Sequence, residues 1–302
     1  MSTADRSIAD GARGKGRTLV SAPRWPRVTV VSPGLIGGSV ARGLRGRRLA
    51  REVVVVARHE AALRAVLDAG AADVGTTDLR AGVVGASLVV LCAPVGALPG
   101  MIRAAWPHLA AGAVMTDVGS VKRSVVEASR GCPSRSDVSF VGGHPMAGSE
   151  RSGFEASDGD LFEGRLALLT PTADTPEAAI AAVTALWESL GSTVRRLSVE
   201  AHDHLVAQIS HLPHLAAYAL VSAAEADALS LAGRGFVDTT RVAASAEALW
   251  TDIFRENRRP LLAALARYEA ILGRWRELAA RGDWATLEAE LGRARELREK
   301  LT

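Results

Sequence analysis

The feature that most constrains the fold is an alternation, over residues 27–197, of short apolar runs with amphipathic helical segments. The runs are rich in β-branched residues and cover 28–31, 53–56, 88–92, 113–117, 138–141 and 193–197. Between several of these runs, apolar residues recur at helical spacing. One such segment ends near Gly46, a second ends near Gly70, and a third covers 176–190. Apolar strands separated by helices are typical of parallel βαβ units. The pattern therefore predicts a doubly wound α/β domain.

After Leu197 the strand signals end, and helical periodicity continues almost to Thr302. Breaks are expected at residues 233–235 and at Pro260. A chain of 302 residues is long enough for two domains. We therefore expect a tail over 1–26, an α/β domain over 27–197 and an all-α domain over 198–302. Helices with this much apolar surface often pack against a partner, which predicts a homodimer through the helical half.

The charge is unevenly distributed along the chain. Residues 1–27 hold six Arg or Lys residues against Asp5 and Asp10, a net charge of +4. Because the whole chain carries +3, the remainder carries about −1. The body of the protein therefore has no basic footprint, and no nucleic-acid partner is expected. Residues 1–26 lack the apolar core of a signal peptide and are expected to be a disordered extension.

Composition indicates a soluble cytoplasmic protein. Hydrophobic residues make up 48% and charged residues 23% of the chain. The uncharged stretch 82–102 contains Pro94 and Pro99, so a strand and loop are expected there in place of a membrane span. Cys92 and Cys132 have neither a metal-ligand spacing nor a disulfide framework, which is typical of a reduced compartment. No membrane partner and no metal site are predicted.

The loop after the first strand resembles a dinucleotide-binding fingerprint with one departure. The pattern Gly-x-Gly-x-x-Gly would place glycines at 32, 34 and 37, and position 32 is a serine. Gly34 would let a pyrophosphate approach the backbone, and Gly37 would let the helix pack on the strand. We expect Gly34, Leu35, Ile36 and Gly37 to bind a dinucleotide in a Rossmann-type domain. The alternative is a tight βα turn that binds nothing.

The end of the second strand bears on the choice of cofactor, NAD or NADP. NAD enzymes place Asp or Glu there to bind the ribose 2′-hydroxyl. Here the strand continues into Ala57-Arg58-His59, and Arg58 could bind a 2′-phosphate. This favours NADP, or a relaxed choice between the two cofactors. The alternative is that Arg58 is a solvated surface charge.

Two segments at predicted strand ends carry candidate catalytic residues. Residues 143–150 present His144 between small residues, and Pro145 would fix the turn that orients the imidazole. Residues 116–122 end a strand and open a helix, at the edge where doubly wound sheets bind ligands. Ser120 could donate to a substrate or to His144, or could cap the following helix.

Three segments of the helical half carry further polar residues. In Ser210-His211-Leu212-Pro213-His214, Ser210 and His214 share one helix face, and Pro213 would kink the helix and free a carbonyl. The spacing of residues 202–204 splays the two histidine rings, so we interpret that segment as a solvated face. Arg241 precedes a helix that contains Trp250, and its guanidinium suits a carboxylate, with a salt bridge to Asp238 as the alternative.

Together these segments resemble the prephenate dehydrogenase family, which includes arogenate and cyclohexadienyl dehydrogenases. The resemblance covers about residues 27–302 and rests on five segments in the family's order and spacing: 34–39, 117–122, 143–150, 210–214 and 238–241 followed by Trp250.

The resemblance implies oxidative decarboxylation of prephenate to 4-hydroxyphenylpyruvate, or of arogenate to tyrosine, with hydride transfer to NAD(P)+. It implies that His144 is the catalytic histidine at the C4 hydroxyl and that Ser120 orients that hydroxyl or the imidazole. It further implies a set of substrate-binding residues: Arg241, His214, Ser210, Ser149 and Trp250. The length implies that the chain lacks the fused mutase or regulatory domain of some family members.

Three alternatives remain open. An enzyme of the family that acts on 4-amino-4-deoxyprephenate would use His144 in much the same way, at a C4 amino group in place of the C4 hydroxyl. A cofactor-binding protein that has lost catalysis would explain Ser32-Pro33, but it would not need His144, Ser120 and Arg241 together. β-Hydroxyacid dehydrogenases typically need a lysine on the first long helix of the second domain, and lysine is absent between Leu197 and Arg298.

Overall fold

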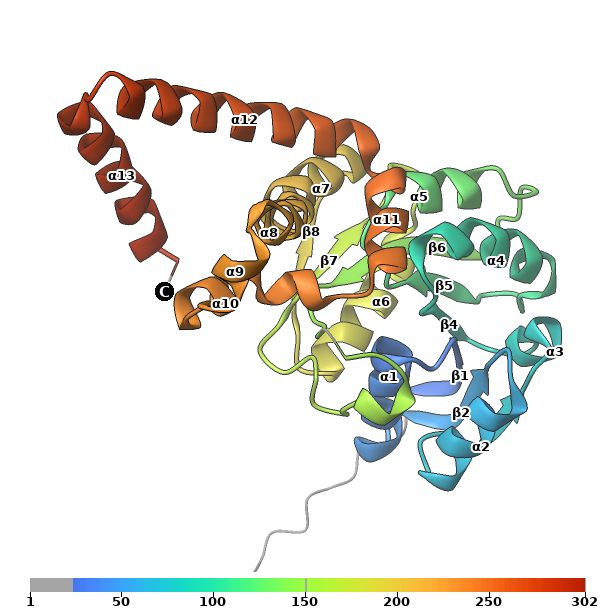
Figure 1. The fold of residues 1–302 in the computed structure, drawn as a ribbon. Coiled ribbons are helices and arrows are strands. Elements are labelled where there is room, and N and C mark those ends of the chain that lie inside the picture. The colour runs from blue at the N-terminus through green and yellow to red at the C-terminus, as the bar shows by residue number, and fades with distance from the viewer. Residues whose placement is uncertain (1–23, 150, 302) are drawn as a thin grey trace, which may run out of the picture.

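One eight-stranded sheet organises the amino-terminal part of the protein. The computed structural model describes residues 24–149 and 151–301. The strand order in the sheet is β3-β2-β1-β4-β5-β6-β7-β8, and the carboxy-terminal part is helical (Figure 1). The predicted class, a doubly wound α/β domain followed by a helical domain, is confirmed. The tail assigned to residues 1–26 lies mostly outside the described residues, and β1 already begins at Trp25.

The strands are short and mostly apolar. Six of them match the predicted runs, and their bounds are β1 (Trp25–Val31), β2 (Ala50–Val56), β4 (Leu88–Leu91), β5 (Val114–Asp117), β6 (Ser139–Pro145) and β8 (Thr193–Arg196). Two strands were not predicted, β3 (Val74–Thr76) and β7 (Leu166–Thr170). From β3 to β6 all neighbouring strands are parallel.

The sequence predicted parallel βαβ units, but one pair of neighbouring strands in the sheet is antiparallel. β7 pairs with β6 in the antiparallel direction, and β8 then pairs with β7 in the parallel direction. The physical reason lies in the connections. In the connection from β6 to β7, the described residues 146–149 and 151–165 contain only the short 3₁₀ turn η3 (Phe154–Ala156), whereas α6 (Glu177–Ser189) crosses over between β7 and β8. Parallel neighbours need such a crossover, and antiparallel neighbours do not.

Helices cover both faces of the sheet. Val28, Val30, Val53 and Val55 belong to a core shared with α1 (Leu35–Gly46), α2 (Glu60–Asp68) and α6. Alternate strand residues such as Val89 and Leu91 belong to a second core with α3 (Leu79–Val83), α4 (Leu98–Ala105) and α5 (Arg123–Arg130). Because successive side chains of a strand point to opposite faces, one sheet organises both cores.

The carboxy-terminal part is built from consecutive helices. They are α7 (Val199–Val206), a π-helical turn η4 (Ala207–His211), α8 (Leu212–Ala223), α9 (Ala226–Leu229), α10 (Arg234–Thr240), the 3₁₀ turn η5 (Arg241–Ala244), α11 (Glu247–Glu256), α12 (Arg258–Ala280) and α13 (Trp284–Glu299). α11 packs Trp250 and Ile253 into the second core of the sheet domain. α12 extends away from the sheet and α13 turns back from its far end, so that the two helices form an arm (Figure 1).

Pro260 does not break the helical pattern where the sequence predicted a break. The chain interrupts its helices at Asn257, and Pro260 lies in the first turn of α12. Proline is tolerated there because the amide hydrogens of a first helical turn have no partner within the helix. Within the described ranges, no helix combines the length and the apolar character needed to cross a membrane.

Candidate active site

The loop between β1 and α1 has the geometry of a pyrophosphate cradle. A Cβ at Gly37 would lie 2.4 Å from the carbonyl oxygen of Ser32 and 2.9 Å from Cβ of Cys92, so only glycine allows this close packing. At Gly34 a Cβ would meet nothing within 4 Å, which leaves space for a ligand. The first turn of α1 contains no acidic residue, so its amides and helix dipole favour an anion. These features fit a dinucleotide.

Ser32 forms the tight turn although the fingerprint has glycine at that position. Its φ angle is 66°, in the left-handed region that favours glycine. The Ser32 amide donates to the carbonyl of Val56 at 2.8 Å, and its own carbonyl accepts from the amide of Gly34 at 2.9 Å. Holding a serine in this conformation costs about 1 kcal/mol. The departure at position 32 therefore leaves the loop intact.

The end of β2 offers a positive charge and no carboxylate. Ala57 is buried, whereas Arg58 and His59 are exposed. Among residues 24–149 and 151–301, no carboxylate pairs with Arg58. The guanidinium is therefore available to a ligand at this edge of the sheet.

A buried ion pair joins the ends of β5 and β6. Asp117 and Lys122 are fully buried and bonded to each other, and the Lys122 ammonium also donates to the carbonyl of Gly143 at 2.7 Å. Asp117 accepts from the amides of Gly119 at 2.8 Å and Gly143 at 3.0 Å. Burial lowers the pKa of Lys122, and the charge of Asp117 opposes that shift. Neither residue was predicted to have a role, yet the pair fixes the backbone directly before His144.

His144 is buried near the end of β6, and its ring contacts a second histidine. Its Nδ1 lies 2.9 Å from Nε2 of His202 on α7, and Nδ1 of His202 lies 2.8 Å from the Asp203 carboxylate. Burial lowers the pKa of His144 well below its usual value, and the neighbouring charges of His202, Lys122 and His211 act in the same direction. His144 is therefore a neutral imidazole at physiological pH.

The interpretation of residues 202–204 as a solvated face is wrong for two of the three. His202 and Asp203 are buried, and only His204 is exposed. Asp203 accepts from the backbone amides of Lys122 at 2.8 Å and Arg123 at 3.0 Å, which ties the middle of α7 to the start of α5. This packing brings His202 against His144.

Ser120 does not cap the helix that follows it. α5 begins at Arg123, and its N-cap is Lys122. Ser120 is half-buried and, within the described part of the chain, forms no hydrogen bond. The backbone is held on both sides of Ser120, because the amide of Gly119 donates to Asp117 and the amide of Lys122 donates to Asp203. The capping alternative is excluded, and the hydroxyl remains free for a ligand at the sheet edge.

Around Pro213 the helix forms a π-helical turn followed directly by α8. Nδ1 of His214 donates to the carbonyl of Ser210 at 2.9 Å, so its Nε2 is an acceptor. The His214 ring stacks on Trp250 with centroids 3.4 Å apart and planes at 21°. Burial lowers the pKa of His214, and the positive charge of Arg241 adds to this shift. The structure thus brings together His214, Ser210, Trp250 and Arg241.

Asn257 connects this cluster to the pair of His144 and His202. Its side-chain amide donates to the carbonyl of Asp203 at 2.8 Å and to Nδ1 of His211 at 3.1 Å. His211 is buried, burial lowers its pKa to about 4, and its ring meets Trp250 edge-on. A continuous series of contacts therefore runs from β6 through α7 and η4 to α11.

Two of the predicted substrate-binding residues lie at the surface. Arg241 is exposed at the start of η5, and Ser149 is exposed in the loop after β6. The Ser149 hydroxyl accepts from the amide of Arg151 at 3.2 Å. Glu150, the last residue of the predicted motif, lies outside the described residues. Among the described residues, no hydrogen bond joins Ser149 to the His144 cluster.

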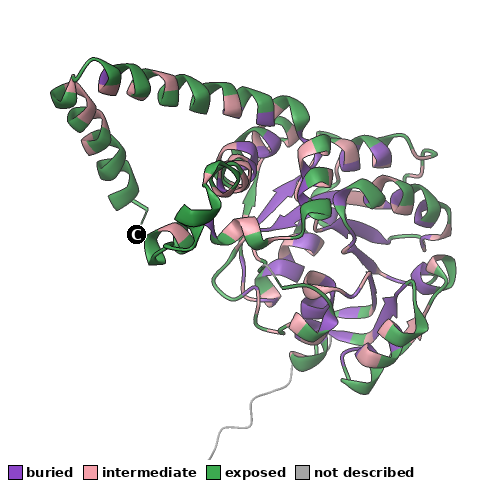
Figure 2. Cartoon of the chain, viewed as in Figure 1, coloured by how far each residue is buried: buried purple, intermediate pink, exposed green. Residues whose placement is uncertain are grey.

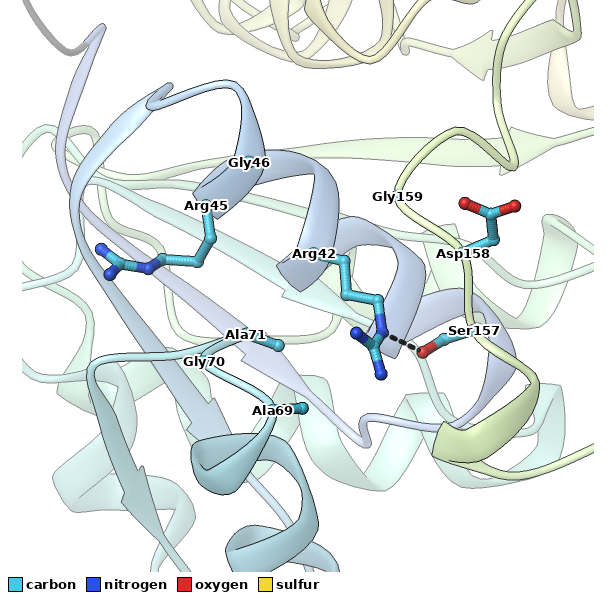
Figure 3. Close-up of a pocket in the computed structure, with 9 residues that line it drawn as sticks. All are labelled: Arg42, Arg45, Gly46, Ala69, Gly70, Ala71, Ser157, Asp158 and Gly159. Atoms are coloured by element: carbon cyan, nitrogen blue, oxygen red, sulfur yellow. Dashed lines mark hydrogen bonds between the residues drawn. The ribbon is translucent and has the colours of Figure 1, made fainter.

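Two cavities lie apart from this cluster. One, of about 360 Å³, lies between α1 and residues 157–159 (Figure 3). Its two arginines are already engaged: Arg42 donates to the Ser157 hydroxyl at 2.9 Å, and Arg45 pairs with Asp73. The other, of about 490 Å³, lies between residues 129–140 and 172–176. None of the predicted site residues lines either cavity.

Two family models match the chain. One describes the nucleotide-binding domain of prephenate dehydrogenase and matches residues 40–196. The other describes the dimerization domain of prephenate dehydrogenase and matches residues 198–293.

Several known proteins are similar over most of the chain. Cyclohexadienyl dehydrogenase of Zymomonas mobilis is 34% identical over 86% of this chain and 90% of its own length. Prephenate dehydrogenase of Bacillus subtilis is 33% identical over 76% of this chain and 63% of its own length. The solved prephenate dehydrogenase from Aquifex aeolicus, in complex with hydroxyphenyl propionate and NAD+, has a TM-score of 0.84 and 32% identity, covering 92% of this chain and 98% of its own. Synechocystis arogenate dehydrogenase has a TM-score of 0.79 and 32% identity, covering 91% of this chain and all of its own.

Proposed function

The chain belongs to the prephenate dehydrogenase family, and we propose that it catalyses the oxidative decarboxylation of prephenate or arogenate for tyrosine biosynthesis. The observation that carries this proposal is His144, a buried neutral imidazole at the sheet edge that also holds the dinucleotide cradle. NAD(P)+, when bound, accepts the hydride from ring C4. The ring carboxylate leaves as carbon dioxide, and the gain of an aromatic ring supplies the driving force.

An assay with three substrates tests the proposal. Reduction of NAD+ or NADP+, followed at 340 nm, is expected with prephenate or arogenate. Activity on 4-amino-4-deoxyprephenate alone would favour a specialised relative instead. Absence of activity with all three substrates and both cofactors would overturn the proposal.

His144 serves as the acceptor for the C4 hydroxyl. Hydride loss makes C4 electron-poor and its hydroxyl acidic, and the neutral imidazole takes up the developing positive charge through that proton. Ser120, whose hydroxyl is not committed to a helix cap, would orient the substrate hydroxyl. His214, Ser210 and Trp250 would form the wall of the pocket on the helical side.

Arg241 is proposed to anchor a substrate carboxylate. Its charge acts on His214, which supports a role for Arg241 beside the proposed pocket. Arg241→Ala is expected to raise the KM for prephenate roughly 10- to 100-fold, since a hydrogen bond to a charged group contributes about 1.5–3 kcal/mol. The kcat should change only a few-fold because the anchor is not at the reacting carbon. Steady-state kinetics measure both, with Arg234→Ala on α10 as the control. A fall in kcat at constant KM would contradict the anchoring role.

Arg58 is proposed to favour NADP over NAD. With Ala57 in place of a ribose-binding carboxylate, the exposed guanidinium can bind a 2′-phosphate. Arg58→Ala is therefore expected to lower kcat/KM for NADP roughly 10- to 100-fold and to leave that for NAD nearly unchanged. Arg64→Ala, an exposed arginine on α2, is the matched control. Strong preference of the unmodified enzyme for NAD would defeat the idea.

The helical domain is proposed to form a homodimer. Most residues of the arm formed by α12 and α13 are exposed (Figure 2). The exposed residues include the apolar Leu262, Ile271, Leu291 and Leu297. Burial of such a surface against a second copy would remove it from water. The match of residues 198–293 to a dimerization domain supports this assignment.

A further inference from the structure

Three buried side chains form a hydrogen-bonded series that ends at the proposed catalytic base. The series runs from the Asp203 carboxylate to His202 at 2.8 Å and from His202 to His144 at 2.9 Å. The first two residues follow each other on α7, and the third is 58 positions earlier in the chain. Since each link joins one donor to one acceptor, the protonation of one end fixes the other.

Asp203 determines which atoms donate and which accept in this series of hydrogen bonds. Its Oδ1 and Oδ2 accept from the backbone amides of Lys122 and Arg123, which can only donate. Burial alone would raise the pKa of Asp203, but the bonds from His202 and these amides lower it below its usual value. The group is therefore a carboxylate that accepts at both oxygens. It follows that Nδ1 of His202 carries a hydrogen and donates it to Asp203.

The charge state of His202 decides which ring nitrogen of His144 carries the hydrogen. A neutral His202 with hydrogen on Nδ1 has a bare Nε2, which must accept from Nδ1 of His144. A cationic His202 would donate instead, and Nε2 of His144 would then carry the hydrogen. Burial and the charge of Lys122 favour the neutral ring, whereas Asp203 and Asp117 favour the cation, and the net effect lowers the pKa of His202. His202 is thus neutral at physiological pH.

We propose that His202, oriented by Asp203, is a positioning residue that holds His144 in the tautomer with hydrogen on Nδ1 and a bare Nε2. The inference deepens the proposed function and rests on it, because the bare Nε2 is the atom that would accept the C4 hydroxyl of the substrate. A free histidine favours hydrogen on the other nitrogen, so without His202 this base would be in the wrong form.

The first test uses substitutions on α7. His202→Phe keeps a ring but removes the acceptor, and its kcat is expected to fall about 100-fold with little change in KM. His202→Gln can still accept from His144 while donating to Asp203, and we expect it to recover to within about 10-fold of the unmodified enzyme. His204→Phe, two residues along the same helix at an exposed position, is the control and should retain full activity. Circular dichroism checks that each variant is folded.

The second test does not depend on activity, and its first measurement needs no variant. Nitrogen-15 NMR of the imidazoles distinguishes the two tautomers directly. His144 of the unmodified protein is expected to show hydrogen on Nδ1, and His202→Phe should shift it towards hydrogen on Nε2. Hydrogen on Nε2 of His144 in the unmodified protein, or a folded His202→Phe with kcat within threefold of normal, would overturn the inference. If the unmodified enzyme oxidises none of the cyclohexadienes, the proposed function fails, and the NMR result still decides the tautomer.

Discussion

Replacing His144 with asparagine is expected to lower kcat about a thousandfold. A positioned general base contributes roughly 10²- to 10⁴-fold, and an amide cannot take a proton. Asparagine can place an N–H near the position of Nδ1 and so keep the bond to His202, which limits any disturbance of the fold. The KM should change little because His144 acts on the transition state more than on the bound substrate. Steady-state kinetics with prephenate provide the measurement.

The protonation of His144 also predicts how kcat/KM depends on pH on the acid side. His144 must be neutral to accept the hydroxyl proton, and its burial, followed by the charges of His202, Lys122 and His211, lowers its pKa well below 6.5. We therefore expect kcat/KM to stay constant as the pH falls through 6.5 and to decline only at the lowered pKa. A decline centred at the ordinary histidine value would contradict the assignment. So would a His144→Asn variant with normal turnover, and His204→Asn serves as the exposed control.

The alternation of apolar runs was sufficient to predict the class of the fold and six of the eight strands. β7 had a recognisable signal, because Gly164 and Pro171 flank the apolar run Leu166–Thr170. β3 has only three residues, one of them a glycine, and no local pattern distinguishes it from a turn. The antiparallel direction of β7 depends on a connection without a crossover helix, which becomes evident only once the strand itself is found.

Residues of the candidate site were predictable only where they belong to a short, recognisable sequence motif. His144 and the glycines of the β1–α1 loop belong to short motifs at strand ends. His202 and Asp203 were misinterpreted because the prediction rested only on the two-residue spacing of His202 and His204, which splays their rings. Val199, His202, Asp203 and Val206 lie at the i, i+3, i+4, i+7 positions of one helix face, a pattern that indicates burial. The partners of that face, the start of α5 for Asp203 and His144 of β6 for His202, could not be identified from the sequence.

Lys122 illustrates the same limit. The residue is charged and adjoins a helix start, so its sequence neighbourhood is typical of a solvated position. Its side chain is nevertheless fully buried, because Asp117 and the Gly143 carbonyl satisfy the ammonium. A Cβ at Gly143 would lie 2.7 Å from the carbonyl oxygen of Asp117, so glycine is required for this close approach. Only the packing of β5 against β6 brings the three together.

Lys122→Met is therefore expected to lower the free energy of unfolding by about 3–5 kcal/mol, because it leaves the Asp117 charge buried without its partner. Urea denaturation at a fixed protein concentration measures the change, since unfolding of a dimer depends on concentration. Arg123→Met alters the next residue, which is exposed, and should change stability by less than about 0.5 kcal/mol.

Adding Asp117→Asn to Lys122→Met should recover part of the loss, since a neutral amide still accepts from the amide of Gly119 or Gly143 and no longer buries a charge. If Lys122→Met alone unfolded at the same urea concentration as the unmodified protein, the ion pair would not stabilise the junction of β5 and β6. If the double variant were less stable than Lys122→Met, the hydrogen bonds of Asp117 to the two backbone amides would outweigh its charge. The three unfolding curves therefore separate the charge of this buried pair from its hydrogen bonds, at the backbone that positions His144.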